Sequence, residues 1–279
     1  MMRRRTFLAA GTAVLAVPYA TRADGIARLS FSGSTEQGAL VIGKALPGAK
    51  VRIDDASVRV SQEGVFAFGL TYDRTQPVHV VADYADGRSE ARDIVPVVRQ
   101  YAIQRINGLP QKLVTPSPEA LERIKRENVL IFEVRKRDTT GVGFAELFDW
   151  PFPGIISSVY GSQRIENGTP MAPHLGIDIA APEGTPIHAP ADAVVSICDD
   201  YFLDGGFTLL DHGHGVSSCY LHQSKRMVAV GDKIARGQVI GLVGKTGRAT
   251  GPHMHWGLNW FQVKLDPSRS TAASEPPKG

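Results

Sequence analysis

Histidine, the side chain best suited to metal binding and proton transfer near neutral pH, is concentrated in one part of this sequence. Seven of the eight histidines lie between His174 and His255. If these segments are strands, in which side chains alternate between two faces, His174 and Asp178 share one face. In the same way His253 shares a face with His255, so spacing alone does not decide which of the two would bind a metal. Two imidazoles and one carboxylate suit Zn²⁺ and leave a fourth position open for water.

A third strand-like segment offers one more histidine. Alternation puts Ser218, Tyr220 and His222 on one face, with Cys219 and Leu221 on the other. We therefore expect three strands to present histidine to a single surface, where a metal site or a proton-transfer site would form.

Three of the other histidines fit structural roles. His79 lies in a strand-like segment far upstream of the cluster. His212 and His214 alternate with glycine in Asp211-His-Gly-His-Gly215, which is typical of a turn. We expect none of these three to take part in chemistry.

The segment from about residue 150 to residue 267 resembles the lysostaphin-type (LytM-type) zinc metallopeptidases, which cut peptidoglycan cross-bridges. The resemblance runs through a series of short motifs: Tyr160-Gly-Ser-Gln-Arg164, His174-Leu-Gly-Ile-Asp178, Ala181-Pro-Glu-Gly-Thr-Pro186, Asp211-His-Gly213, Tyr220-Leu-His222, Arg236-Gly-Gln-Val-Ile-Gly-Leu-Val-Gly244 and Thr246-Gly-Arg-Ala-Thr-Gly-Pro-His253-Met-His255. Two departures, Ala193 and His188, touch none of these motifs.

The resemblance implies an antiparallel β domain with one Zn²⁺ per chain in a groove that binds peptide stems of peptidoglycan. It implies that His174, Asp178 and His255 are the zinc ligands. It also implies that His222 and His253 are catalytic, one taking a proton from water and one stabilising the oxyanion or protonating the leaving amine. Which of the two is the general base stays open.

Four further residues are candidates for supporting roles. Arg164 could hold a substrate carboxylate with two hydrogen bonds, or could fix the preceding loop, and Tyr160 of the same motif is a candidate substrate-binding residue. Cys198 and Cys219 lie in strand-like segments of an exported chain, where they either form a disulfide or serve as two small buried apolar residues.

The elements around this segment predict a mostly β protein in several parts. Short strands separated by turn residues over 24–102 predict an immunoglobulin-like β-sandwich. A connector and linker follow over 103–149, with a helix that starts at Ser117 as N-cap and has Leu121 and Ile124 on its apolar side. The peptidase domain occupies 150–267, and 268–279 is a C-terminal tail.

The first 23 residues have the layout of a secretory signal peptide. Basic residues precede an apolar run and small residues, and Arg4-Arg5 is similar to a twin-arginine export signal. We therefore expect an exported, periplasmic protein without stable membrane insertion. Without this segment the net charge of +3 falls to −1, because four basic residues and no acidic ones are removed, so nucleic acid is not an expected partner. We expect a monomer.

Three functions compete for this sequence. The first is a zinc endopeptidase that hydrolyses peptide cross-links of peptidoglycan. The second is a catalytically silent, wall-binding activator of a murein amidase, which the presence of all five site residues disfavours. The third, a biotinyl or lipoyl carrier domain, rests only on the hairpin-like run that begins at Val230. Which cross-link is cut is left open, although a periplasmic location favours D-alanyl–diaminopimelate.

Overall fold

Strands make up most of the regular structure of the chain. The computed structural model describes residues 28–108, 110–273 and 275–277, and it confirms the mostly β fold predicted from the sequence. The signal segment predicted over residues 1–23 lies outside the described residues. Within the described part of the chain, no helix is both long enough and apolar enough to cross a membrane.

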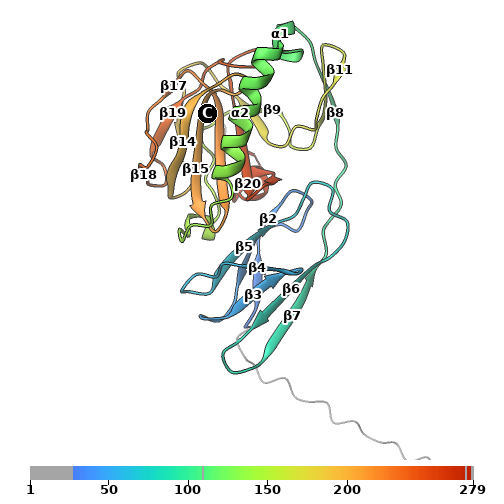
Figure 1. The fold of residues 1–279 in the computed structure, drawn as a ribbon, viewed down its shortest axis with the longest axis vertical. Coiled ribbons are helices and arrows are strands. Elements are labelled where there is room, and N and C mark those ends of the chain that lie inside the picture. Colours follow the sequence, from blue (N-terminus) through green and yellow to red (C-terminus); the bar gives the residue numbers. More distant parts are fainter. Residues whose placement is uncertain (1–27, 109, 274, 278–279) are drawn as a thin grey trace, which may run out of the picture.

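Two antiparallel sheets form the N-terminal domain, coloured blue to cyan in Figure 1. One sheet has the order β1 (Ser30–Ser32), β2 (Leu40–Lys44) and β5 (Val65–Gly69). The other has the order β4 (Ala56–Val58), β3 (Lys50–Ile53), β6 (Val78–Asp83) and β7 (Ser89–Ile94). Inward-facing residues such as Phe66, Phe68 and Val80 are fully buried in one core. The immunoglobulin-like type of this arrangement stays a prediction.

The C-terminal domain is built on one long antiparallel sheet. Its strand order is β18 (Lys233–Ile234), β14 (Ala193–Tyr201), β15 (Gly205–Gly213), β16 (Val216–Gln223), β20 (His253–Trp260), β12 (Ile177–Ala180) and β9 (Ile155–Ser158), and β21 (Val263–Leu265) pairs with β20. A small sheet of β13 (Pro186–His188), β19 (Val239–Leu242) and β17 (Lys225–Arg226) shares a core with one face of the long sheet. Ile187, Ile240, Met254 and Trp256 are fully buried there.

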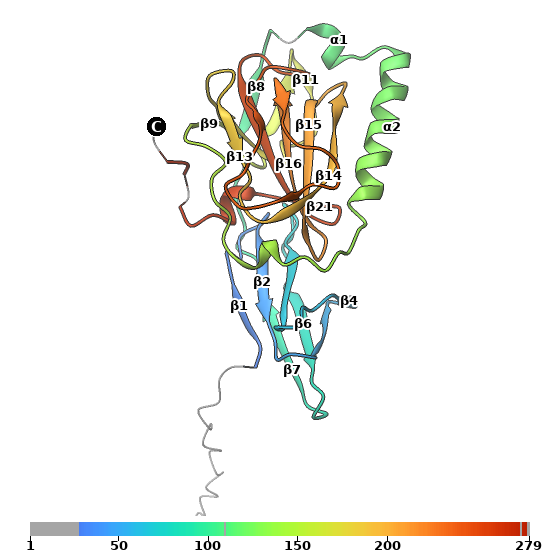
Figure 2. The ribbon, with the colours of Figure 1, turned by 90° about the vertical axis from the view of Figure 1, so that its left-hand side faces the viewer.

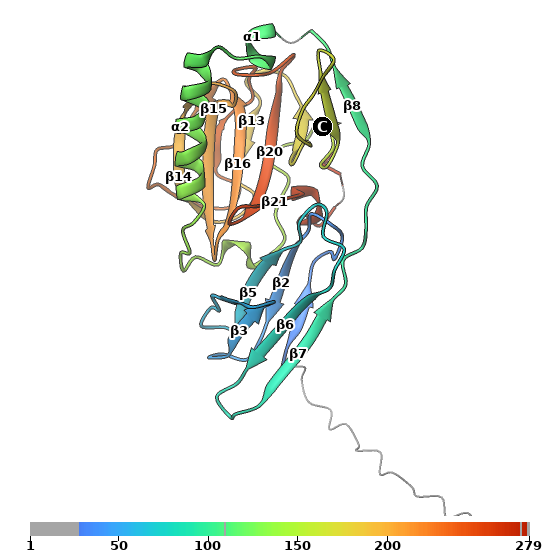
Figure 3. The same cartoon turned by 45° about the vertical axis from the view of Figure 1, so that its right-hand side comes forward.

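Helix α2 (Pro118–Val134) lies on the opposite face, alongside β14 and β15 (Figures 2 and 3). The helix starts as predicted, because the side chain of Ser117 accepts a hydrogen bond from the Ala120 N–H. The predicted apolar side is wrong for Leu121, which is 51% exposed, whereas Ile124 is partly buried. The buried residues are Ile131 and Val134, near the other end of the helix. The remaining short helices are α1 (Gln111–Val114), η1 (Gly143–Ala145) and η2 (Pro267–Arg269).

The connector between the two domains packs against the C-terminal domain. Strand β8 (Ile103–Ile106) pairs in parallel with β10 (Gln163–Glu166), which also pairs with β11 (Thr169–Pro170). In the linker, the Thr139 hydroxyl donates to Asp211 at 3.0 Å, and Phe144 is buried in the main core. The linker therefore packs on the same face of the sheet as the small sheet does.

Tyr160 is part of the contact between the two domains. It is 1% exposed, and its hydroxyl donates to the Lys264 carbonyl at 2.9 Å. Its ring lies against Tyr101 and under the Arg99 guanidinium, which forms a 2.8 Å ion pair with the buried Asp266. The prediction that Tyr160 binds substrate is wrong, because the ring is enclosed and its hydroxyl already has a partner.

The cysteines lie on different strands and different sides of the long sheet. Cys198 in β14 and Cys219 in β16 are separated by β15. Cys198 packs toward the main core, whereas Cys219 packs under α2. Both are free. The disulfide alternative is wrong, and the two act as small apolar residues.

His212 belongs to a buried chain of hydrogen bonds. Its Nδ1 lies 2.9 Å from the Asp192 carbonyl, so it donates there, and its Nε2 lies 2.7 Å from the Ser218 hydroxyl. Ser218 in turn lies 2.8 Å from the Tyr220 hydroxyl. The carbonyl can only accept, so His212 is held as a neutral ring with Nε2 as acceptor. Burial lowers the pKa of His212 to about 4.

Replacing Ile131 tests whether the end of α2 belongs to the folded core. We expect Ile131→Ala to lower the free energy of unfolding by about 2–5 kcal/mol, because it leaves a cavity over β14 and β15. Leu130→Ala, at a neighbouring position that is 48% exposed, should change it by less than about 0.5 kcal/mol. Urea unfolding measures both variants, and equal effects would contradict this packing.

His212 should make stability depend on pH. Its pKa falls from 6.5 to about 4 on folding, so the unfolded chain binds the proton more tightly and protonation favours unfolding. The stabilisation is complete above pH 6.5 and is lost as the pH falls toward 4, a change of about 3 kcal/mol. The stability gap between the wild type and His212→Gln should narrow by that amount over this range in urea unfolding. A gap that stays constant between pH 6.5 and pH 4 would contradict this account of His212.

Candidate metal and catalytic site

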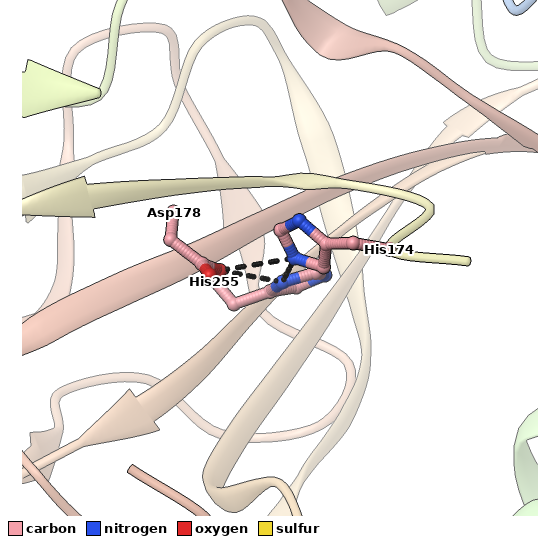
Figure 4. A group of neighbouring side chains, drawn as sticks. All are labelled: His174, Asp178 and His255. Atoms are coloured by element: carbon pink, nitrogen blue, oxygen red, sulfur yellow. Dashed lines mark hydrogen bonds and ion pairs between the residues drawn. The ribbon is translucent and has the colours of Figure 1, made fainter. Parts of the chain in front are cut away.

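Three side chains from two places in the sequence meet at one point of the long sheet (Figure 4). Asp178 in β12 stands directly opposite His255 in β20, and their Oδ1 and Nδ1 atoms lie 2.9 Å apart. His174 Nε2 lies 2.9 Å from His255 Nδ1 and 3.1 Å from Asp178 Oδ1. His174 precedes β12 instead of lying on it, so the prediction that alternation along one strand places it beside Asp178 is wrong. The chain loops back to bring the ring in.

The three facing atoms form a triangle that fits a metal ion. Their separations of 2.9, 2.9 and 3.1 Å are close to the roughly 3.3 Å expected between ligands bound at 2.0–2.1 Å in a tetrahedral site. The side chains of His174, Asp178 and His255 are 4%, 9% and 15% exposed, so the donors are largely shielded from solvent. Two imidazoles and a carboxylate are a zinc donor set.

A second layer of hydrogen bonds orients His174. Its Nδ1 lies 2.9 Å from the Ser158 hydroxyl and 3.3 Å from the Val159 carbonyl. Ser158 itself donates to Gln104 Oε1 at 2.6 Å. The His174 proton is therefore on Nδ1, which leaves the Nε2 lone pair pointing toward the candidate metal position.

Arg164 reaches the same group from β10. Its guanidinium donates to Asp178 Oδ2, while Oδ1 of that carboxylate faces the two imidazoles. Burial alone would raise the pKa of Asp178, but the imidazoles of His174 and His255 beside it hold it well below its usual value. The same guanidinium donates to the Ser158 hydroxyl at 3.3 Å, so this side chain orients a candidate ligand and contacts the strand end before the preceding loop. The substrate-binding alternative for Arg164 stays a prediction.

Gly176 leaves the space that the His255 ring occupies. A Cβ at this glycine would overlap the imidazole at Cε1 and Nε2, and would lie 2.9 Å from the Trp256 carbonyl. Burial lowers the pKa of His255 to about 4, although Asp178 acts in the opposite direction. The ring is therefore neutral near pH 7 and can offer a lone pair.

His222 and His253 lie together, with ring centres 4.7 Å apart. The Nδ1 atom of His222 lies 2.9 Å from the Thr246 carbonyl, and that of His253 lies 2.8 Å from the Gly251 carbonyl. Each carbonyl fixes the proton on Nδ1 and leaves Nε2 free to accept one. Burial and the neighbouring imidazoles His253 and His255 lower the pKa of His222 to about 3, so it is neutral near pH 7.

His222 does not reach this position by strand alternation. Ser218 and Tyr220 face the buried network around His212, on the other side of the sheet, so the prediction that they share a face with His222 is wrong. A register shift between β15 and β16 lies next to His222, whose φ of 65° turns the chain. The bulge and this left-handed residue redirect the side chain.

The other histidines lie away from this site. His79 is a strand residue, as predicted, and its ring lies 2.6 Å from Asp93. His188 bonds to the Gly237 carbonyl at 2.8 Å. His214 has a φ of 49° in the turn after β15, as the glycines predict, and its ring contacts Phe144.

A cleft of about 400 Å³ opens beside the three facing donors. His174, His222 and His255 lie on its surface, and α2 contributes one wall through residues that include Ile131 and Arg135. Sequence reasoning missed this wall, as it missed Ser158 and Gln104. The only feature of the sequence that pointed to Ser158 was its closeness to the Tyr160 motif. No feature of the sequence pointed to Gln104.

Comparison with known proteins agrees with this geometry. Residues 172–267 match the model of "Peptidase family M23". The chain is 43% identical over 104 residues to peptidoglycan DD-endopeptidase ShyA of Vibrio cholerae. These residues cover 37% of this chain and 24% of that protein. The chain is 45% identical over 83 residues to DD-carboxypeptidase/endopeptidase Mpg of Neisseria meningitidis, covering 30% and 19% of the two chains. The chain therefore spans at most about a quarter of the length of these curated relatives.

A solved structure extends the likeness beyond the catalytic segment. The crystal structure of a Pseudomonas aeruginosa protein named as a peptidase M23 matches with a TM-score of 0.63 and 30% sequence identity. The match covers 84% of this chain and 94% of the Pseudomonas chain, so it includes both domains. By its sequence, its fold and the arrangement of its histidines, the chain belongs to peptidase family M23.

Proposed function

We propose that this protein is a zinc-dependent endopeptidase that hydrolyses peptide cross-links of peptidoglycan. The observation that carries the proposal is the triangle of His174, Asp178 and His255 donor atoms beside two histidines whose Nε2 atoms are free. The names of the Vibrio and Neisseria relatives support peptidoglycan as the substrate. An exported, periplasmic monomer is part of the same proposal.

His174, Asp178 and His255 would hold the zinc ion, through Nε2, Oδ1 and Nδ1 respectively. A zinc ion with three protein ligands polarises a carbonyl and acidifies the attacking water. Ser158 and Arg164 keep two of these ligands in position, one by accepting from His174 and one by donating to Asp178.

His222 and His253 would move the protons. A neutral His222 accepts the proton of the attacking water at Nε2, because its Nδ1 proton is held by a backbone carbonyl. His253, which has the same tautomer and is partly exposed, donates to the oxyanion or the leaving amine once it is protonated. The proposal assigns the base role to His222 because burial favours its neutral form.

The interpretation as a silent activator of an amidase gains no support from the site. All five side chains are present, the donor atoms of three of them converge, and a cleft opens beside them. The carrier interpretation fails as well, because Val230 begins a turn at the edge of a peptidase sheet.

Digestion of purified sacculi tests the proposed function. The full mature chain loaded with zinc should cut the cross-links between stems. Mass spectrometry should then detect muropeptide monomers in place of dimers, and a chelator should abolish this conversion. Intact cross-links after prolonged digestion of several wall types by zinc-loaded protein would refute it.

Single substitutions should separate two classes of residue. His174→Ala, Asp178→Asn and His255→Ala should lose zinc, because two protein donors are too few for a stable site. His222→Ala and His253→Ala should keep near-stoichiometric zinc and lose about 10²–10⁴-fold in rate, the contribution of one acid–base group. Metal analysis and muropeptide release measure the two properties, with His79→Ala as an unaffected control. A zinc-free His253→Ala beside a zinc-loaded His255→Ala would reverse the ligand assignment.

Gly176→Ala tests the space beneath the His255 ring. The added methyl group should displace the imidazole from the donor triangle and weaken zinc affinity by about 10–100-fold, as the loss of an orienting contact does. Gly251→Ala is the matched control, because its Cβ meets no atom within 4 Å. Competition with a zinc chelator gives both affinities, and equal values would contradict the role of this glycine.

A further inference from the structure

The cleft continues beyond His255 toward the end of α2. Side chains alternate along β20, so His255, Gly257 and Asn259 lie on the same face of the sheet. Asn259 stands directly opposite Lys264 of β21, and both residues line the cleft. At about 3.4 Å per residue, Asn259 lies roughly 14 Å from His255 along the strand. A bound peptide that follows β20 would pass over these residues.

Arg135, at the end of α2, faces the same stretch of the sheet. Its Nη2 lies 3.8 Å from the Sγ of Cys219, which is the cross-strand partner of Gly257. The Arg135 Nε and the Asn259 Nδ2 are both buried without a hydrogen-bond partner, and Asn259 is only 2% exposed. Buried N–H groups are rarely left unpaired, because each costs free energy unless it finds an acceptor.

The cations of the cleft fall into two groups. Arg164 pairs with Asp178, and Arg248 pairs with the buried Glu166 at 3.0 Å. Arg135 and Lys264 form no ion pair with any described residue. The positive charge that is free to meet a ligand therefore lies at the far end of the cleft from Arg164.

One acidic side chain lies near the positive charges of Arg135 and Lys264. Asp204 lines the cleft, also without an ion pair to any described residue, and Arg135 and Lys264 both act on it electrostatically. Burial raises the pKa of Asp204, although Arg248 and Arg135 act to lower it. Burial also lowers the pKa of Lys264, and Arg135 adds to that shift. Two basic side chains without an ion pair thus face one carboxyl group at this end of the cleft.

We propose that Arg135, Lys264 and Asn259 form a subsite that binds a carboxylate group of the peptide substrate. The inference rests on the proposed function, since it assumes that a peptidoglycan stem occupies the cleft. The three side chains offer guanidinium, ammonium and amide N–H donors, and a carboxylate is the acceptor that a peptide stem carries, on a side chain or at its C-terminus. Arg135 lies at the level of Gly257, about 7 Å along the strand from His255, which is the reach of roughly two peptide residues from the cleaved bond.

A matched pair of substrates tests the subsite. A cross-linked muropeptide dimer with free carboxylates is compared with the same dimer in which the carboxylates are converted to carboxamides. We expect the wild type to cleave the free acid with a kcat/KM about 10–100-fold higher, the worth of a hydrogen bond to a charged group. Arg135→Gln should remove this preference by raising KM for the acid, with the amide unaffected, and Arg135→Lys should restore part of it. Arg126→Gln, an exposed arginine of the same helix, should keep the preference.

Binding to the metal-free full chain gives a readout that is independent of hydrolysis. Calorimetry with a linear stem peptide, as free acid and as amide, should show a Kd about 10-fold lower for the acid, and Arg135→Gln should equalise the two. Equal Kd values in the wild type, or an Arg135→Gln variant that weakens acid and amide alike, would overturn the subsite. If the wild type cleaves neither dimer, the proposed function fails, and the calorimetry still decides the subsite.

Discussion

The site depends on one antiparallel register. β12 runs between β9 and β20, so that Ser158, Asp178 and His255 form a single row across three strands. Side chains alternate, so a shift of β20 by one residue would turn His255 into the core and bring an apolar neighbour to the surface. Met254 and Trp256, both fully buried, oppose that shift because exposing either would lose the free energy of burying a large apolar side chain. The packing of two apolar residues thus holds the imidazole between them.

Alternation in the sequence predicts part of this arrangement and fails at identifiable places. It correctly puts His253 and His255 on one face, because both lie within a regular strand. It fails for His174, which lies in the irregular segment before β12, and for His222, which has a positive φ next to a register shift. Period-two reasoning holds only where the backbone stays extended, and the irregular backbone here is what brings the two rings to the site.

Long-range pairing accounts for the rest of what the sequence did not predict. Gln104 reaches Ser158 because β8 pairs in parallel with β10, a strand about 60 residues later. Nothing in the local sequence of either strand specifies that partner. The same limit applies to the cysteines, whose spacing gave no sign that a strand lies between them, and to α2, whose buried residues could be identified only once the sheet it covers was known.

The proposed hydrolytic groups and one wall of the cleft come from different stretches of this chain. The five residues proposed to bind zinc and move protons all fall within 172–267, the segment shared with the family, whereas the α2 wall of the cleft lies outside it. Under the proposed function, mutations in the helix would change which peptides fit without disturbing the hydrolytic groups. After gene duplication, one copy could acquire different side chains along the α2 side of the cleft through changes in this helix alone. Family membership by itself therefore says little about which peptide bond such a copy would cleave.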